Sequence, residues 1–289
     1  MGREETMKQT PFVKMHGLGN DFIIFDERNE SLSLSPTRIA ALAHRKRGIG
    51  CDQLITISQP ECAQADVFVR FFNADGSEAY ACGNGSRCVA AFISSHADEE
   101  RMRGIGCQQA MKPVLQTRVG LLPTFIGSNG LVTVDMGVPK TAWYDIPLAM
   151  ETDTQYLPLV GDPAAVSVGN PHVTFFVQDF SLLAEGERLE RHPLFPQRAN
   201  IGFALIESQQ RIRLKVYERG VGVTEACGSA ACAAVINAVR RGLTERVCDV
   251  VLDGGTLHIR WEVETHHVFM TGPVAIPFEG KVNLNAFAI

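Results

Sequence analysis

The sequence predicts an α+β protein of two pseudo-symmetric domains, each a mostly antiparallel sheet rolled around a central helix. The tripeptide Ala-Cys-Gly occurs at residues 81–83 and again at 226–228, an offset of 145 residues in a chain of 289. An alternating, strand-like run precedes each copy, at 67–72 and at 212–217. The stretch after the second copy is apolar almost all round, which predicts a helix buried inside a wrapped sheet.

The first half is expected to contain one surface helix as well as the repeated strand, loop and helix. Ser35-Pro36 supplies a capping residue and a first-turn proline, so a helix begins there and ends near Gly48. A polar loop follows the strand 67–72, and the small-residue stretch 84–97 is the next helix.

The second half repeats this order and adds further strands. Its helix covers 229–242 and closes with two arginines and a glycine, as a helix end should. Asp253-Gly254 marks the turn of a hairpin between two strand-like runs. Further strands are expected at 173–177 and 200–206.

The repeat sets the predicted domain boundaries. An N-terminal lobe, 1–127, would carry Cys82, and a C-terminal lobe, 128–277, would carry Cys227, with 278–289 returning to the first lobe. Clefts between domains are preferred ligand sites, so we expect the active site in the cleft between the lobes.

Composition excludes several classes of protein. The chain has 27 basic and 32 acidic residues, a net charge of −5, which opposes binding to nucleic acid or to a membrane surface. No apolar run approaches the roughly 20 residues that span a bilayer, and the polar start MGREETMKQT resembles no signal peptide. A cytoplasmic enzyme or binding protein is therefore expected.

The eight cysteines are spread along the chain without a CxxC pair, so neither a disulfide framework nor a zinc site is expected. The histidines also lack the spacing of metal ligands, which predicts no metal. Six cysteines are expected to be packing residues: Cys51, Cys62, Cys88, Cys107, Cys232 and Cys248.

Cys82 and Cys227 differ from the others because each directly precedes a predicted helix. The first turn of a helix has backbone N–H groups without intrahelical partners and a partial positive charge. We therefore expect a thiol pKa below its usual value of about 8.5 at both positions. The N–H groups of Gly83, Asn84, Gly228 and Ser229 are candidates to hold a carboxylate.

Two thiols placed on opposite faces of one carbon could invert it. One thiolate removes a proton from one face while a thiol delivers a proton to the other, and the roles exchange in the reverse reaction. Two similar half-sites suit a substrate and a product that are near mirror images at that carbon. The acidity of an amino-acid α-hydrogen is very low, so preorganised donors and exclusion of water must stabilise the transition state.

Four separated motifs resemble those of the diaminopimelate epimerase family. They are HGLGNDF (16–22), NADGSEAYACGNGSRC (73–88), GNPH (169–172) and ERGVGVTEACGSAACAA (218–234). The resemblance implies interconversion of LL- and meso-diaminopimelate without a cofactor, for lysine and peptidoglycan precursor synthesis. It also implies a cytoplasmic enzyme that forms a homodimer.

Carried over position by position, the resemblance implies that Cys82 and Cys227 are the acid and base. The amides of Gly83, Asn84, Gly228 and Ser229 would hold the reacting carboxylate. Glu218 would orient the reacting amine and His172 would lie close to it. The rest of the substrate would be bound by Asn20, Gln53, Asn73, Asn170, Asn200, Glu218 and Arg219.

Two positions depart from the family pattern, and other functions remain open. Many relatives have Glu where this chain has Val223 and Gly where it has Ala230; we expect the chemistry to survive both changes. A proline or hydroxyproline racemase would share the two cysteines but usually carries His at the position of Asn84. A thiol–disulfide redox protein, or a catalytically dead relative, is a further alternative.

Overall fold

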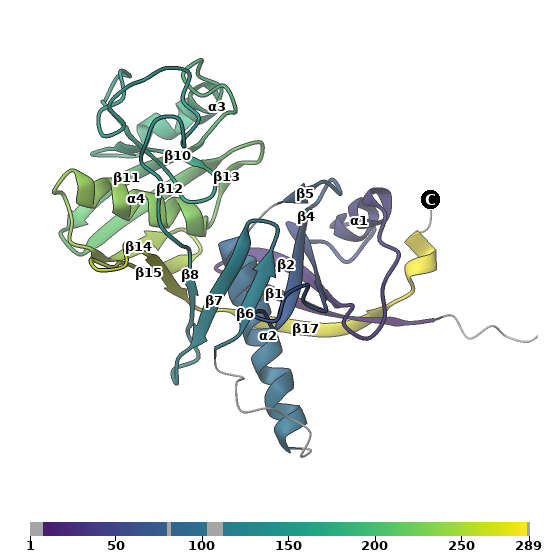
Figure 1. Ribbon diagram of the computed structural model, residues 1–289. Helices are drawn as coiled ribbons and strands as arrows, with labels where there is room; N and C mark the ends of the chain where they lie inside the picture. The colour runs from purple at the N-terminus through teal and green to yellow at the C-terminus, as the bar shows by residue number, and fades with distance from the viewer. Residues whose placement is uncertain (1–7, 80–81, 103–111, 288–289) are drawn as a thin grey trace, which may run out of the picture. The chain divides into compact units, whose positions relative to one another are not determined.

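The computed structural model describes residues 8–79, 82–102 and 112–287, with only the backbone of 96–102 (Figure 1). Contacts divide the chain into two compact units. The first takes in the chain up to Gly17, Asp21–Pro123 and the chain from Val274 onward, and the second takes in Leu18–Asn20 and Thr124–Pro273. Both units are sheet-dominated with few helices, which confirms the predicted α+β class.

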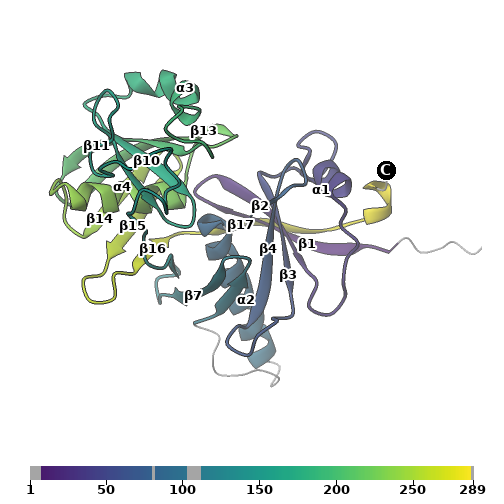
Figure 2. The same cartoon turned by 45° about the horizontal axis from the view of Figure 1, so that its top comes forward.

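The first unit is built on one sheet with the strand order β17–β1–β2–β3–β4–β6–β7, and β5 also pairs with β4. Its strands are β1 (Thr10–Gly17), β2 (Asn20–Asp26), β3 (Gln53–Ser58), β4 (Val67–Asn73), β5 (Glu78–Ala79), β6 (Val114–Thr117), β7 (Gly120–Ile126) and β17 (Ala275–Val282). The helices are α1 (Pro36–Ala43), α2 (Gly83–Met102) and the 3-10 helix η2 (Leu284–Phe287), which lies beside α1 (Figure 2).

Helix α1 begins at Pro36, behind the capping hydroxyl of Ser35, as predicted. It ends at Ala43, five residues earlier than the predicted end near Gly48. The chain turns back at His44, and the returning N–H groups of 49–51 donate to the last helical carbonyls. Those carbonyls are satisfied without another helical turn, so the helix stops there.

Helix α2 packs directly on the sheet where β3 and β4 lie side by side. A Cβ at Gly85 would come within 2.8 Å of Phe71 and 3.0 Å of Ile55, so only glycine permits this approach. Phe71 and Ile55 are opposite each other in the β3–β4 register, two residues from Asn73 and Gln53. The start of α2 therefore lies over the strand ends that carry two predicted site residues.

The second unit has the strand order β9–β10–β11–β12–β14–β15–β16–β8; β13 also pairs with β12, and the end of β7 pairs with β8. Its strands are β8 (Val132–Asp135), β9 (Ala164–Ser167), β10 (Pro171–Phe176), β11 (Asn200–Ser208), β12 (Arg211–Glu218), β13 (Gly222–Thr224), β14 (Val247–Leu252), β15 (Gly255–Trp261) and β16 (Val268–Gly272). The helices are η1 (Ser181–Glu185), α3 (Gly186–Glu190) and α4 (Gly228–Arg240).

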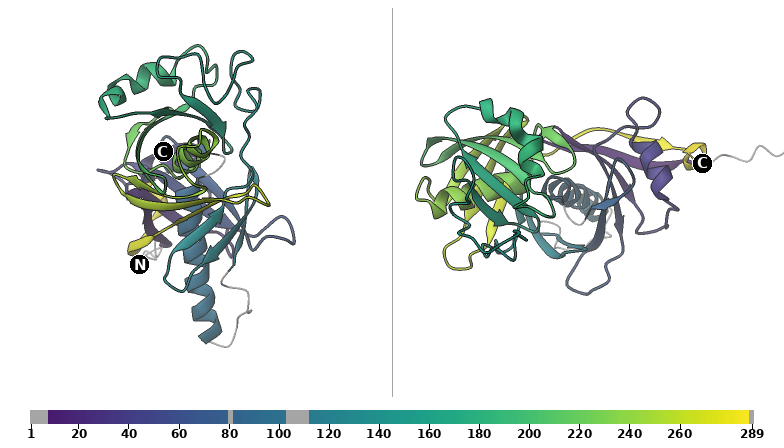
Figure 3. Two further views of the ribbon diagram at one scale, coloured as in Figure 1. Left: turned by 90° about the vertical axis from the view of Figure 1, so that its left-hand side faces the viewer. Right: turned by 90° about the horizontal axis from the view of Figure 1, so that it is seen from above.

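Helix α4 is the buried centre of this unit. It contacts seven strands, β9 to β12 and β14 to β16, which curve around it in the left view of Figure 3. The residues from Ala230 to Ala238 are all buried, which confirms that an almost wholly apolar helix is an interior one. The described residues include no helix long and apolar enough to cross a membrane.

The two units repeat one topology, as the internal repeat predicted. In the first unit, β2 and β3 are parallel, β3 and β4 are antiparallel, and β5 and β6 both pair with the other edge of β4. In the second unit, β10 and β11 are parallel, β11 and β12 are antiparallel, and β13 and β14 both pair with the other edge of β12. Gln53 lies opposite Asn73. The β11–β12 register, continued by one step, places Asn200 opposite Glu218. Equivalent strand ends therefore carry equivalent polar side chains.

Candidate active site

Cys82 lies directly before α2 in the first unit. Its Sγ accepts a hydrogen bond of 3.4 Å from the N–H of Gly85, and its carbonyl accepts from both the N–H and the hydroxyl of Ser86. Sulfur thus takes the place of a capping oxygen at the helix start. The predicted carboxylate-holding residues, Gly83 and Asn84, are the first two residues of α2, and Asn84 is buried.

Gln53 and Asn73 lie beside each other at the ends of β3 and β4. The Gln53 Nε2 donates to Asn73 Oδ1 at 3.0 Å, and Asn73 Nδ2 donates to the Ser77 hydroxyl at 3.1 Å. The buried Gln53 Oε1 has no hydrogen-bond partner among the described residues. Buried acceptors are normally satisfied, so this oxygen is available to a ligand.

Cys227 is the N-cap residue of α4 and is 5% exposed. Its Sγ lies 3.5 Å from the Ser229 hydroxyl, and its carbonyl accepts from Ala231 at 3.1 Å. Gly228 and Ser229 are the first residues of the helix, which matches the predicted helix start to within one residue. The two cysteines therefore occupy the same position at the start of a helix in each repeat.

The expected lowering of the thiol pKa is wrong for Cys227. Burial, followed by the negative charge of Glu218, raises its pKa well above the usual value, and the Ser229 hydroxyl and the Ala230 amide offset only part of this. Loss of hydration in a closed apolar environment, reinforced by a neighbouring carboxylate, outweighs the partial charge of a helix start. Cys227 is accordingly held as the neutral thiol.

The ends of β10, β11 and β12 bring four more predicted residues together. His172 Nε2 lies 2.9 Å from Asn170 Oδ1, and His172 is paired with Asn200 in the strand register. Asn200 donates to the Pro171 carbonyl at 3.1 Å and accepts from the backbone N–H of Arg219 at 3.0 Å. These bonds hold Asn200 in one orientation at the strand end.

His172 is 1% exposed, and burial lowers its pKa to about 3, with a smaller contribution from the positive charge of Arg219. The imidazole is therefore neutral at ordinary pH. The Arg219 side chain is exposed, and its guanidinium donates to the Gln197 carbonyl at 3.1 Å. A guanidinium held in this way can still pair with a carboxylate through its other N–H groups.

Asn20 begins β2, two residues before Phe22, which lies opposite Gln53 in the β2–β3 register. Asn20 also belongs to the turn Leu18–Asn20, which clusters with the second unit although β2, which begins at Asn20, continues into the first. In this turn Leu18 and Gly19 have positive φ, and a Cβ at Gly19 would lie 2.3 Å from the Glu225 carboxylate. The positive φ of Gly19 favours glycine, whereas the contact with the end of the exposed Glu225 side chain could be relieved by a movement of that side chain.

Sequence reasoning missed several residues that hold the site in place. Thr224 donates to Glu218 Oε1 at 2.5 Å, and Ser77 links Asn73 to Asp75. The Asp-Gly-Ser loop had a turn signature, which could have indicated an Asx turn. No local signal pointed to Thr224, because its partner is reached only when β13 folds back on β12.

A charged cluster in the first unit was also missed. Asp21 accepts two bonds from Arg45, at 2.7 and 3.0 Å, and Lys14 Nζ lies 2.6 Å from its Oδ2. Arg45 also pairs with Asp52 at 2.6 Å. Burial alone would raise the pKa of Asp21, but its bonds to Arg45 and Lys14 lower it overall. The cluster ties the start of β2 to the residue preceding β3.

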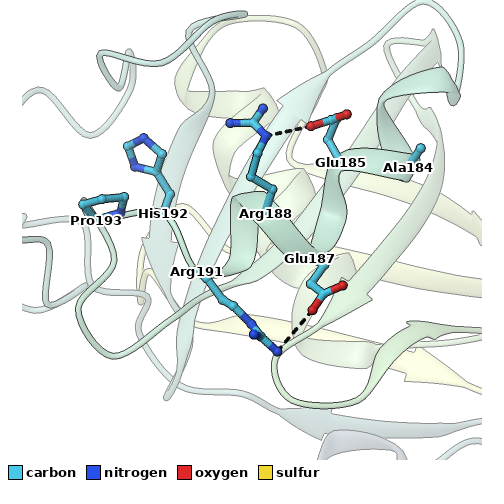
Figure 4. A pocket seen from close by; sticks show the side chains of 7 residues that line it. All are labelled: Ala184, Glu185, Glu187, Arg188, Arg191, His192 and Pro193. Carbon is cyan, nitrogen blue, oxygen red and sulfur yellow. Dashed lines mark hydrogen bonds and ion pairs between the residues drawn. The ribbon is translucent and has the colours of Figure 1, made fainter.

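A shallow hollow lies on η1 and α3 (Figure 4), and none of the predicted site residues is among those that line it. Its charged side chains pair with each other: Glu185 with Arg188 at 2.7 Å and Glu187 with Arg191 at 3.3 Å. Because these charged side chains pair with each other, none of them is left to bind a ligand. The lining residues are Ala184, Glu185, Glu187, Arg188, Arg191, His192 and Pro193.

The other cysteines have no place in the predicted chemistry. Cys51, Cys88, Cys232 and Cys248 are buried free thiols, Cys62 is half-buried, and Cys107 lies outside the described residues. Within the described ranges, no group of three or more His, Cys, Asp or Glu residues could hold a metal ion. Val223 is exposed on β13, and Ala230 is buried in the first turn of α4.

Solved structures share this fold. A phenazine biosynthesis protein of the PhzF family from Bacillus anthracis aligns with a TM-score of 0.65 at 16% identity, over 96% of this chain and 99% of that one. A hydroxyproline epimerase from Agrobacterium vitis aligns with a TM-score of 0.63 at 13% identity, over 96% and 93%. At these identities the likeness establishes a shared fold, and in this chain a cysteine directly precedes a helix in each repeat of that fold.

Sequence comparison gives the family. The diaminopimelate epimerase family model matches residues 12–141 and 164–277. The diaminopimelate epimerase of Gluconobacter oxydans is 55% identical over 93% of this chain and 97% of that protein. The enzyme of Acidiphilium cryptum is 50% identical over 94% and 96%. The chain belongs to the diaminopimelate epimerase family.

Proposed function

We propose that this enzyme interconverts LL- and meso-2,6-diaminopimelate by moving a proton between two thiols, Cys82 and Cys227. The observation that carries the proposal is the repeated topology, which places one cysteine at the same helix start in each unit. A two-base inversion needs two such groups, one for each face of the α-carbon. Relatives at 43–55% identity are named diaminopimelate epimerase, which supports this substrate.

The environments of the two thiols differ, which supports distinct roles at rest. Glu218 raises the pKa of Cys227, after burial, while the equivalent position in the first unit is the neutral Asn73. We assign Cys227 as the acid and Cys82 as the base for one direction. The Cys82 thiolate takes the α-proton and becomes a thiol, the Cys227 thiol gives its proton to the opposite face and becomes a thiolate, and the reverse reaction restores both.

The reacting carboxylate is assigned to the first-turn amides of the two helices, those of Gly83, Asn84, Gly228 and Ser229. An anion at a helix N-terminus is stabilised by the backbone N–H groups and by the helix dipole. The polar strand ends would bind the second amino-acid end of the substrate, with Arg219 on its carboxylate. These residues are Asn20, Gln53, Asn73, Asn170, Asn200, Glu218 and Arg219.

Neither alternative function is favoured. Proline-type racemases share the fold at identities below 20%, whereas the relatives at much higher identity are named diaminopimelate epimerase. A redox couple would need no polar strand ends and no second amino-acid subsite. We further propose that the enzyme needs no cofactor or metal, acts in the cytoplasm as a homodimer and binds neither nucleic acid nor membranes.

The proposal is tested by incubating the protein with LL-diaminopimelate in deuterated water and following the stereochemistry and deuterium content of the product. We expect meso product labelled at the inverted carbon without added pyridoxal phosphate or metal. Cys82→Ala and Cys227→Ala should each abolish inversion, while Cys62→Ala, a half-buried thiol outside the motifs, should leave it intact. Inversion at wild-type rate by either of the first two variants would reject the two-thiol mechanism, and inversion of proline alone would reject the substrate.

A further inference from the structure

A chain of hydrogen bonds runs from the surface of the first unit to the half-buried side chain of Gln53. Ser77 donates its hydroxyl to Asp75 at 2.6 Å, and Asn73 Nδ2 donates to the Ser77 oxygen at 3.1 Å. Gln53 Nε2 then donates to Asn73 Oδ1 at 3.0 Å. The chain ends at Gln53 Oε1, which is buried and has no partner among the described residues.

The direction of every bond in this chain is fixed by its surface end. The Ser77 hydroxyl and backbone N–H lower the pKa of Asp75, so this carboxylate is ionised and only accepts. Ser77 must therefore donate outward, which leaves its oxygen to accept from the Asn73 amide nitrogen. Asn73 in turn offers only its carbonyl to Gln53, and Gln53 must direct its own carbonyl away from Asn73.

The loop that carries Asp75 and Ser77 is held rigidly. It joins β4 to β5, with backbone bonds from Asn73 to the Ser77 carbonyl at 2.8 Å and from Gly76 to the Asn73 carbonyl at 2.9 Å. Gly76 has φ +87°, and a Cβ there would lie 2.2 Å from the carbonyl oxygen of Pro36 in α1. A loop so packed keeps Asp75 in place as an acceptor.

Among the described residues we find no equivalent hydrogen-bond chain in the second unit, and the side chain at the equivalent position explains the difference. Glu218 replaces Asn73 at the equivalent strand end, and Thr224 donates to it directly. A carboxylate has two equivalent acceptor oxygens and needs no orientation, whereas an amide can rotate by 180° and exchange donor for acceptor. The hydrogen-bond chain occurs in the unit where the equivalent residue is an amide.

We infer that Asp75 and Ser77 are positioning residues that hold the Gln53 carbonyl toward the substrate, where it accepts a hydrogen bond from an ammonium group of the diamino acid. This inference rests on the proposed function. If Asp75 is removed, Ser77 can donate to Asn73 instead, Asn73 rotates, and Gln53 presents its NH2 group to the ammonium. Two donors then face each other, and substrate binding weakens.

The test compares Asp75→Ala with Asp179→Ala. Asp179 forms the same Asp-x-Ser turn, with Ser181, on the exposed surface of the second unit, but its turn leads to no site residue. We expect Asp75→Ala to raise KM for LL-diaminopimelate about tenfold with kcat nearly unchanged, because the lost bond is to a charged group. Asp179→Ala should change KM by less than about twofold. Asp75→Asn, whose carbonyl can still accept from Ser77, should restore KM to within about threefold.

A substrate analogue sharpens the comparison. 2-Aminopimelate, which lacks the second amine, should bind Asp75→Ala and wild type about equally if Gln53 contacts that amine. Equal KM values for diaminopimelate in the Asp75 and Asp179 variants would overturn the inference. So would failure of Asp75→Asn to rescue a raised KM, because the role would then be structural.

A second measurement does not depend on activity. Protein labelled with 15N-glutamine gives NMR signals for the side-chain amide protons of Gln53, which are identified by their loss in Gln53→Met. These protons should exchange with solvent about tenfold faster in Asp75→Ala than in the wild type, because they turn away from Asn73. Unchanged exchange would overturn the inference even in an active enzyme. Failure of the wild type to epimerise diaminopimelate would instead reject the proposed function, and the exchange experiment would still decide the orientation of Gln53.

Discussion

Replacement of Glu218 by Gln should lower the pKa of the Cys227 thiol. After burial, the negative charge of this carboxylate is the largest cause of the raised pKa of Cys227. Glutamine keeps the size and a hydrogen-bonding group but removes the negative charge. Because a like charge disfavours the thiolate, its removal must lower the pKa of Cys227.

The magnitude follows from Coulomb's law. Two unit charges about 4 Å apart repel each other by about 4 kcal/mol at an effective dielectric of about 20. Glu218 is only half-buried, and its carboxylate accepts a 2.5 Å hydrogen bond from Thr224, so we expect roughly half of this repulsion energy to act on the Cys227 thiolate. About 2 kcal/mol corresponds to a roughly thirtyfold larger thiolate fraction at a pH below the pKa.

The assay is alkylation of Cys227 by iodoacetamide at pH 8, followed on its own peptide by mass spectrometry. Glu218→Gln should be alkylated roughly ten- to fiftyfold faster than wild type, since the reactive species is the thiolate. Glu225→Gln provides the control, because this exposed carboxylate lies two residues before Cys227 but is not among the groups that shift the pKa of its thiol. A rate that is unchanged or slower in Glu218→Gln would refute the electrostatic reasoning.

Three further predictions concern stability, each measured by chemical unfolding. His172 is buried with its pKa lowered to about 3, so below pH 6.5 the unfolded chain takes up a proton at this residue and the folded protein does not. As the pH is lowered from 6.5 to 3, the free energy of unfolding should therefore fall by about 1.4 kcal/mol per pH unit. His172→Gln should lose this contribution to the pH dependence. Gly85→Ala should cost about 1–3 kcal/mol, because its Cβ would meet Phe71 at 2.8 Å; no loss would mean that α2 shifts freely. Arg45→Met should cost about 1–2 kcal/mol at pH 7, because among the described residues the half-buried Asp21 would keep Lys14 as its one cationic partner. An unchanged midpoint would show the pairs to be energetically neutral.

Much of the fold could be predicted because its signals are local. Alternating apolar residues, a cap with a first-turn proline and an Asp-Gly turn each act over a few residues, and β12, α1 and the β14–β15 hairpin formed where expected. The end of α1 could not be predicted in this way. Its last carbonyls are satisfied by residues 49–51, and only the folded chain shows that those residues return.

In the candidate site, too, the local features could be predicted from the sequence and the effects of distant neighbours could not. The internal repeat was sufficient to single out Cys82 and Cys227 and to place each at the start of a helix. The sequence could not show that Glu218 and burial would raise the pKa of Cys227, since both effects depend on neighbours in space. Likewise, the order Asn-Ala-Asp-Gly-Ser reveals a turn, but not that the turn orients Gln53 from twenty residues away.

The sequence by itself determined the two-fold repeat, the α+β class, the helix starts with their cysteines and the family of the chain. Each of these is recorded in the order and periodicity of residues, which act on their near neighbours along the backbone. Only the tertiary structure decided the protonation of Cys227, the neutral state of His172, the direction of the hydrogen bonds that connect Gln53 to Asn73 and Ser77, and the ion pair between Asp21 and Arg45. Desolvation and charge act through space, so they are settled only once distant segments have packed together.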